Sequence, residues 1–142
     1  LWWKSGNPER FNYQPHSNIA RVYQISLAIQ KAEELIVKYA CPAFIMGDFN
    51  AGIDSACMNE VAKLGWTEAH DLCTGERDET KGHHFCAPDG FERGEPGVYH
   101  DALDHIIVKN GSAVAIRSYK RLNDAWFDCV SDHYPLYVDI EI

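Results

Sequence analysis

The sequence predicts a mixed α/β fold, with one mixed β-sheet covered by helices. Three observations predict it: an amphipathic segment from Ser17 to Tyr39, an apolar run from Ala43 to Met46, and an alternating segment from Tyr134 to Ile142. A period near 3.6 residues indicates a helix, and a period of two indicates a strand. A helix followed by a buried strand is the second half of a βαβ-like unit. The chain has 142 residues, enough for one domain with a core, and we expect residues 1–142 to belong to a single domain.

The first element is a helix over Ser17 to Tyr39, with Ser17 as its N-cap. Apolar residues recur there at steps of three and four and form one stripe: Val22, Ile25, Ile29, Ala32, Ile36 and Tyr39. Polar residues occupy the other side, and Pro42 ends the helix because proline cannot continue it.

The second element is a strand over Ala43 to Met46, which is bounded by Pro42 and Gly47 and should be buried on both faces. If the extended geometry continues, Asp48 and Asn50 project together on one side. Polar groups at the end of a buried strand are a common setting for a functional site. The alternative is an ordinary turn, because Gly, Asp and Asn all favour turns.

The middle of the chain predicts a second helix over Ser55 to Leu64, closed by Gly65. A short mixed segment follows. The stretch from Thr74 to Gly97 is rich in Gly and Pro and predicts a long loop, and loops of this length are usually functional.

The last third predicts three strands. Ala102 to Lys109 should be joined through the Asn110-Gly111 turn to Ser112 to Arg121 as a hairpin. Tyr134 to Ile142 alternates strictly, and Pro135 near its start predicts either an edge position or the first paired residue.

Composition narrows the classes of function. Hydrophobic residues make up 46% and charged residues 24% of the chain, which is ordinary for a globular protein. There is no apolar run long enough to span a membrane. The net charge of −8 argues against a broad basic surface for nucleic acid, although it leaves nucleic acid and other phosphate substrates open. The five cysteines have no metal-binding spacing, so reduced thiols are expected.

Polar residues are associated with three strand segments. They are Asp48 with Asn50, Asp104 with His105, and Asp132 with His133. Hard oxygen ligands suit Mg²⁺ or Mn²⁺, and an imidazole suits proton transfer near neutral pH. Magnesium-assisted attack on a phosphate ester needs this combination of carboxylates, an amide and a histidine.

In this order the motifs resemble the endonuclease/exonuclease/phosphatase superfamily, which includes apurinic endonucleases, neutral sphingomyelinases and inositol-polyphosphate phosphatases. The resemblance rests on Gly-Asp-Phe-Asn-Ala at Gly47 to Ala51, Asp-His-Ile at Asp104 to Ile106, and Ser-Asp-His-Tyr-Pro at Ser131 to Pro135. Arg21 and Gln24, on the helix before the first motif, also fit the pattern.

The resemblance implies roles for five of these residues. Asp48 would position or deprotonate the attacking water, and Asn50 would steady the water and the phosphoryl oxygens. Asp132 would help to bind Mg²⁺ or Mn²⁺. His133 would contact the scissile phosphate or exchange a proton, and Asp104 would orient His133.

Three further residues have weaker assignments. His84 would contact the substrate phosphate, with a solvated loop histidine as the alternative. Arg21 would be a phosphate ligand or, more simply, a structural partner of an acid. His105 replaces a commoner tyrosine of the family and is expected to pack in the core.

The resemblance also implies that this chain is the C-terminal half of the fold, one half of a four-layer α/β sandwich. Leu1 in place of Met fits an excised piece. The family's metal-binding glutamate lies in the other half, so we expect weak or no activity from this chain alone. One sheet face would be left exposed, which predicts docking of the missing half or of a second copy.

Two other functions remain open at this point. One is a non-catalytic binding or scaffold domain that keeps the phosphoesterase fold. The other is a small zinc hydrolase that uses His83, His84 and His100 with a cysteine. The substrate is not given by the sequence, although the acidic balance favours a small or lipid phosphate ester.

Overall fold

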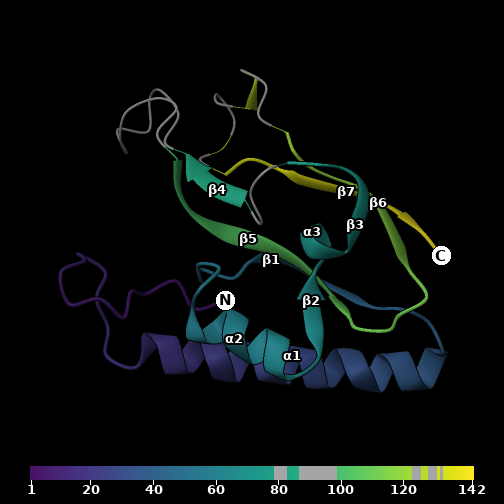
Figure 1. Ribbon diagram of the computed structural model, residues 1–142. Coiled ribbons are helices and arrows are strands. Elements are labelled where there is room, and N and C mark those ends of the chain that lie inside the picture. Colours follow the sequence, from purple (N-terminus) through teal and green to yellow (C-terminus); the bar gives the residue numbers. More distant parts are fainter. Residues whose placement is uncertain (79–82, 87–98, 123–125, 128–130, 132) are drawn as a thin grey trace.

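The computed structural model describes residues 1–78, 83–86, 99–122, 126–127, 131 and 133–142 (Figure 1). The helices are α1 (Ser17–Tyr39), α2 (Ala56–Lys63) and α3 (Ala69–Leu72). The strands are β1 (Phe44–Asp48), β2 (Trp66–Glu68), β3 (Cys73–Arg77), β4 (His83–Cys86), β5 (Tyr99–Lys109), β6 (Ala115–Arg121) and β7 (Leu136–Glu141).

These elements confirm the predicted α/β class, but the strands form two sheets where one was expected. The first sheet has the order β1-β5-β2, with β4 also paired to β5, and all of these pairings are antiparallel. The second sheet has the order β3-β6-β7, in which β3 and β6 are parallel and β6 and β7 are antiparallel. Strand β5 is the common partner in the first sheet.

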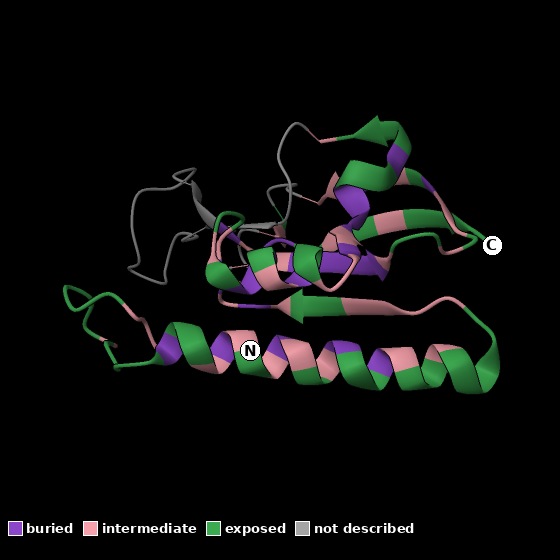
Figure 2. Ribbon diagram, turned by 60° about the horizontal axis from the view of Figure 1, so that its bottom comes forward, coloured by how far each residue is buried: buried purple, intermediate pink, exposed green. Residues whose placement is uncertain are grey.

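Helix α1 has the predicted bounds, but its N-cap differs from the prediction. His16 is the cap residue, in the left-handed region at φ 67°, and Ser17 is the first helical residue. The Ser17 hydroxyl donates to the Gln14 carbonyl at 2.7 Å, so it ties the helix to the preceding turn. Figure 2 shows buried residues recurring along one side of α1 and exposed residues along the other. Ile25, Ile29 and Ala32 are buried as the apolar stripe predicts, but Tyr39 of that stripe is exposed and Arg21, expected on the polar side, is buried.

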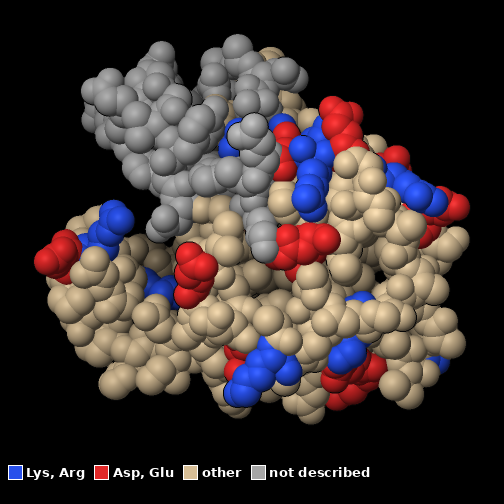
Figure 3. Space-filling model, viewed as in Figure 1, with Lys and Arg blue, Asp and Glu red and all other residues tan. Residues whose placement is uncertain are grey.

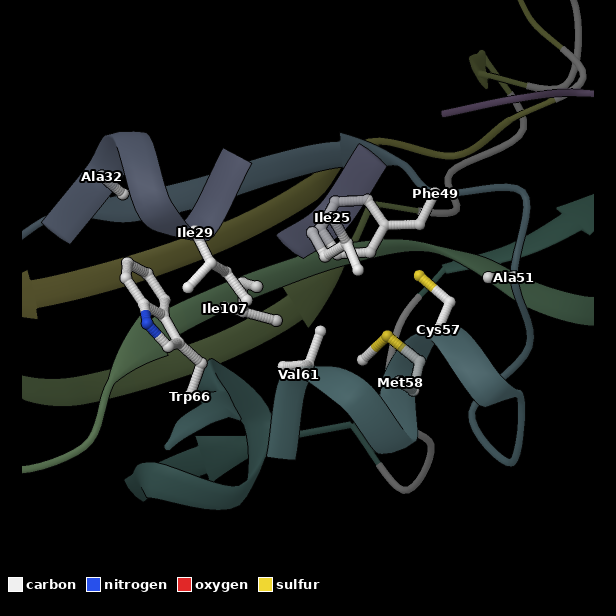
Figure 4. Close-up of a cluster of buried hydrophobic side chains, with 10 residues drawn as sticks. All are labelled: Ile25, Ile29, Ala32, Phe49, Ala51, Cys57, Met58, Val61, Trp66 and Ile107. Carbon is white, nitrogen blue, oxygen red and sulfur yellow. The ribbon is translucent and has the colours of Figure 1, made fainter. Parts of the chain in front are cut away.

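The first core lies between the helices and one face of the first sheet (Figure 4). Ile25 and Ile29 of α1 point toward Ile107 of β5, and Trp66 of β2 closes one end. Helix α2 packs beside α1, and its N-cap is Ser55, whose Oγ accepts from the Met58 N–H at 3.2 Å. This second helix and its cap agree with the sequence prediction.

The second core lies on the other face of β5. Ile106 points there because side chains alternate along a strand, and it packs with Ile116 and Tyr119 of β6. Fully buried Ala69 of α3 and Cys73 of β3 complete the cluster. Strand β5 therefore lies between two layers, with helices on one face and the second sheet on the other (Figure 1).

Strand β1 is not buried on both faces as predicted. In the described part of the chain it pairs only with β5, so it is an edge strand, and Met46 is 63% exposed. The apolar run could not reveal this, because burial of a strand depends on partners that lie far away in the sequence.

The predicted hairpin between β5 and β6 is also wrong. The turn at Asn110-Gly111 forms, with Gly111 at φ 75°, but the chain then crosses to the second sheet. The predicted loop from Thr74 to Gly97 includes β3 and β4, and residues 79–82 and 87–98 lie outside the described residues. Strand β7 is at the edge of its sheet, which is one of the two alternatives that Pro135 predicted.

Cys41, Cys57 and Cys73, whose side chains are described, are free thiols. Cys57 and Cys73 are buried and Cys41 is exposed. Burial raises the pKa of the Cys57 thiol to about 11, so this thiol is neutral and unreactive at physiological pH. Within the described ranges, no helix has the length and apolar character that a membrane span needs.

Candidate active site

The first segment of the site is the turn that follows β1. The strand ends at Asp48, and Asn50 takes the left-handed region at φ 50°. The Asp48 carboxylate accepts from the Asn50 backbone N–H at 2.6 Å and from the Asn50 side-chain amide at 2.8 Å. The two side chains meet through this tight turn, and not through continued strand alternation as predicted. A turn and a functional site are therefore compatible here, because the turn itself brings Asp48 and Asn50 together.

These contacts fix the orientation of the Asn50 amide. Its Nδ2 faces two acceptors, the Asp48 carboxylate and, at 3.4 Å, the Leu1 carbonyl. Its Oδ1 is the polar atom that neither contact uses. A carbonyl oxygen accepts hydrogen bonds, so this orientation suits a water molecule better than a phosphoryl oxygen.

The second segment joins β5 to the start of the C-terminal strand. His133 Nδ1 lies 2.5 Å from Asp104 Oδ2, and both side chains are partly exposed. The His133 backbone N–H donates to Ser131 Oγ at 3.0 Å, which braces the approach to β7. A carboxylate at Nδ1 favours the tautomer that carries its proton there, and Nε2 is then the basic nitrogen of the neutral ring. The contact that the sequence predicts between these two residues is present.

The register of the first sheet brings the two segments together. Asp48 of β1 is the Cα partner of Asp104 of β5. Directly opposed residues of an antiparallel pair project from the same face, so the two carboxylates share that face. On the neighbouring strand β4, His83 is opposite Asp104 and His84 is opposite Ala102. The side chains of these histidines, and all of Asp132, lie outside the described residues.

Arg21, a candidate phosphate ligand, is buried against the N-terminal segment. It is 7% exposed, and its Nη1 donates to the carbonyls of Trp2 and Lys4 at 2.9 and 2.7 Å, while Nη2 reaches Asn18 at 2.5 Å. Gln24 accepts from the Trp2 N–H at 2.8 Å. These two side chains fix the N-terminal segment onto α1. These contacts fit a structural role for Arg21, with carbonyl and amide oxygens as partners in place of the expected acid.

A buried polar pair, His105 with Glu68, lies beneath the turn. Both ring nitrogens of His105 are hydrogen-bonded: Nδ1 to Glu68 and Nε2 to the Ala51 carbonyl, at 2.7 Å for the latter. The sequence prediction placed His105 in the core and missed Glu68. The available signal was that Glu68 lies two residues after Trp66, on the same face of a short strand.

Opposing effects act on the pKa of His105. Burial favours the neutral ring, but the hydrogen bond to Glu68 and the charges of Glu68 and Asp104 outweigh burial and raise the pKa of His105. The ring is therefore held protonated more strongly than an ordinary histidine.

Several basic side chains of the described surface are paired with acids. On the face shown in Figure 3, the Lys and Arg side chains of the described residues lie in small groups, mostly beside acids. Five basic side chains of the described residues pair with acids: Lys31, Lys63, Lys109, Arg117 and Lys120. No continuous basic surface suited to a long polyanion is visible on this described face.

A divalent metal needs several oxygen, nitrogen or sulfur ligands close together. In the described ranges, no group of three or more His, Cys, Asp or Glu side chains is placed to hold a metal. Asp48, Asn50 and Asp104 offer hard oxygens at neighbouring positions of the β1–β5 pair, and oxygens of this kind fit Mg²⁺ or Mn²⁺. Two like charges opposed on neighbouring strands also favour a nearby cation, which would offset their repulsion.

No family model and no curated protein matches this sequence. Solved structures do match the fold. A mannosyl-6-phosphatase from Bacteroides thetaiotaomicron is 23% identical, with a TM-score of 0.65 over 87% of this chain and 46% of that one. An endonuclease/exonuclease/phosphatase family protein from the same organism is 25% identical, with a TM-score of 0.65 over 87% and 44%. One from Bacteroides vulgatus is 20% identical, with a TM-score of 0.68 over 88% and 45%.

The chain has the fold of the endonuclease/exonuclease/phosphatase family. It spans less than half the length of these structures, so it represents part of that fold. The resemblance seen in the motifs therefore agrees with the fold.

Proposed function

We propose that this protein belongs to an enzyme that hydrolyses phosphate esters by metal-assisted attack of water. The observation that carries this proposal is the opposition of Asp48 and Asp104, which brings the Asp48–Asn50 turn and the Asp104–His133 pair to one face of the sheet. A rigid sheet thus presents a candidate base, an amide and an oriented imidazole together.

Each residue has a role that its contacts support. Asp48 holds the attacking water and accepts its proton, and Asn50 Oδ1 orients that water. Asp104 keeps a proton on His133 Nδ1, so the imidazole presents Nε2 toward the phosphate side of the site. A protonated Nε2 would donate to a phosphoryl oxygen and offset negative charge there.

Asp132 is the residue of this chain that we assign to the metal. Mg²⁺ or Mn²⁺ would supply positive charge that stabilises the phosphate as water attacks. Because the chain has a negative net charge, such a local cation would offset its repulsion of any phosphate substrate.

A small phosphate ester is the substrate class that the observations favour. The chain is acidic, and many of its described basic groups are already paired. One structure with the same fold is a mannosyl-6-phosphatase, which acts on a small sugar phosphate as its name states. Both observations favour a monoester or a small diester over long nucleic acid.

Because the chain spans 44–46% of three similar structures, we propose that it turns over little substrate by itself. A metal-ligating glutamate implied by the resemblance would come from the rest of the fold. The exposed edge strand β1, with Met46 on its surface, is a place for that part or for a second copy to dock.

The test is a hydrolysis assay with two generic substrates, 4-nitrophenyl phosphate and bis(4-nitrophenyl) phosphate. The product of the complete reading frame and the 142-residue chain are each assayed with Mg²⁺, with Mn²⁺ and with EDTA. We expect turnover by the complete product that EDTA abolishes, with a rate for the chain at least tenfold lower. Absence of turnover of either ester with both metals would contradict the proposal and favour a non-catalytic domain with this fold.

A further inference from the structure

The segment from Phe49 to Ala51 lies beneath the candidate site, and contacts with β5 hold it in place. The Phe49 N–H donates to the Leu103 carbonyl at 2.8 Å, which extends the β1–β5 pairing past the end of β1. The Phe49 ring packs on the His105 ring, with centroids 5.1 Å apart, and the Ala51 carbonyl accepts from His105 Nε2. The residues on both sides of Asn50 are thus attached to the same strand.

Asn50 has a φ of 50°, in the left-handed region that Asn adopts more readily than most other L-residues. The contacts on both sides of Asn50 select this conformation. The Asp48 carboxylate contributes one restraint from within the turn, and His105 contributes the restraint on Ala51 from outside it.

The hydrogen-bond pattern determines where the protons of His105 lie. The Ala51 carbonyl can only accept, so Nε2 must carry a proton. The contact between Nδ1 and Glu68 Oε1 then requires a second proton between these two atoms. Glu68 therefore fixes both the orientation of the ring and its ability to donate to the turn, as a carboxylate behind an imidazole does in general.

Stability alone does not account for this pair. Both side chains are at least nine-tenths buried, and Glu68 Oε2 has no hydrogen-bond partner among the described residues. Burying an ion pair with one oxygen unsatisfied costs free energy that an apolar pair of similar size would avoid.

We propose that Glu68 and His105 are positioning residues, which hold Asn50 in the geometry that the reaction needs. The proposal rests on the proposed function for its catalytic consequence. Side-chain alternation on β5 explains the arrangement. Asp104 points to one face and orients His133, while His105 points to the other face and holds the Asn50 turn. Two consecutive residues thus support the two halves of the site.

The first test needs no variant and no activity. In long-range ¹H–¹⁵N spectra of the ¹⁵N-labelled protein at pH 7, we expect both ring nitrogens of His105 to be protonated. An Nε2 that carries no proton would overturn the proposal, because His105 would then have nothing to donate to Ala51.

The second test compares Glu68→Gln and His105→Gln with the control His70→Asn. His70 is also buried and hydrogen-bonded to a backbone carbonyl, that of Asp78, but it packs on Tyr119 of the second core. We expect the Asn50 backbone and side-chain amide resonances to shift in the first two variants and to keep their positions in the control. Unchanged Asn50 resonances in a folded Glu68→Gln protein would overturn the proposal whether or not the enzyme is active.

If the complete product hydrolyses a phosphate ester, kinetics add a second readout. We expect kcat to fall about 10- to 100-fold in Glu68→Gln with KM within about threefold of the wild type, which is the range for residues that orient catalytic groups. Equal losses in Glu68→Gln and His70→Asn would show a merely structural effect. An inactive wild-type protein would contradict the proposed function, while the spectra would still decide the positioning role.

Discussion

Asp48 on β1 and Asp104 on β5 are directly opposed across an antiparallel pair, and each carries one segment of the candidate site. Asp48 accepts two hydrogen bonds from Asn50, and Asp104 contacts His133 Nδ1. Because the register of two strands sets this relationship, residues far apart in the sequence meet without help from a flexible loop.

The Asp104–His133 contact leads to the first prediction. Asp104→Asn keeps the size of the side chain but removes the charge that favours the proton on His133 Nδ1. We expect kcat of the complete product to fall by at least about tenfold, as happens when a carboxylate behind a functional histidine is lost. The control is Asp139→Asn, an exposed acid on β7. Equal rates for Asp104→Asn and the wild type would show that the Asp104–His133 contact does not contribute to catalysis.

Arg21 allows a clean distinction between a structural role and a substrate role. Arg21→Met removes the donors to the Trp2 and Lys4 carbonyls, so we expect the free energy of unfolding to fall by about 1–3 kcal/mol. Limited proteolysis should also cut residues 1–16 faster. KM should stay unchanged at a temperature where the variant is folded. A raised KM with no loss of stability would instead identify Arg21 as a phosphate ligand.

The buried pair beneath the turn predicts a pH dependence of stability. Because the pKa of His105 is raised in the folded state, its contribution is fully present below the ordinary histidine pKa, about 6.5, and is lost as the pH rises through the raised value. We expect the difference in unfolding free energy between the wild type and His105→Gln to shrink as the pH rises above this value. Urea titrations at several pH values would measure it, and a constant difference from about pH 6 to 9 would contradict the raised pKa.

The exposed edge of β1 predicts self-association of the isolated chain. Met46 lies on an edge strand and is 63% exposed. We expect light scattering to show a dimer at micromolar concentrations and Met46→Lys to shift the protein toward monomer, because a charge on an edge strand opposes pairing. The control is Val37→Lys on the exposed side of α1. A monomeric wild-type chain would contradict this expectation.

The sequence was informative where structure is local. The α1 bounds followed from a complete apolar stripe, and the α2 cap followed from a serine before a second stripe. The Asp104–His133 contact was predicted from the resemblance and not from spacing, since 29 residues separate the two side chains.

The sequence was uninformative where structure depends on distant partners. A run of apolar residues does not reveal whether β1 is central or at an edge, and a good turn at Asn110-Gly111 does not reveal that β5 and β6 join different sheets. Glu68 was missed for the same reason. Its proposed role depends on His105, 37 residues away, and the local signal, a place two residues after Trp66 in a three-residue strand, does not identify that partner.

The central claim is that the Asp48–Asn50 turn is the place where water is activated for attack on a phosphate ester. The most direct measurement is the initial rate of bis(4-nitrophenyl) phosphate hydrolysis in Mg²⁺ by the complete product and its Asp48→Asn variant. We predict a loss of about 10²- to 10⁴-fold, the range for removal of a general base, in a variant that stays folded. Equal rates in the two proteins would contradict the account, because hydrolysis would then not depend on the residue around which the site is built.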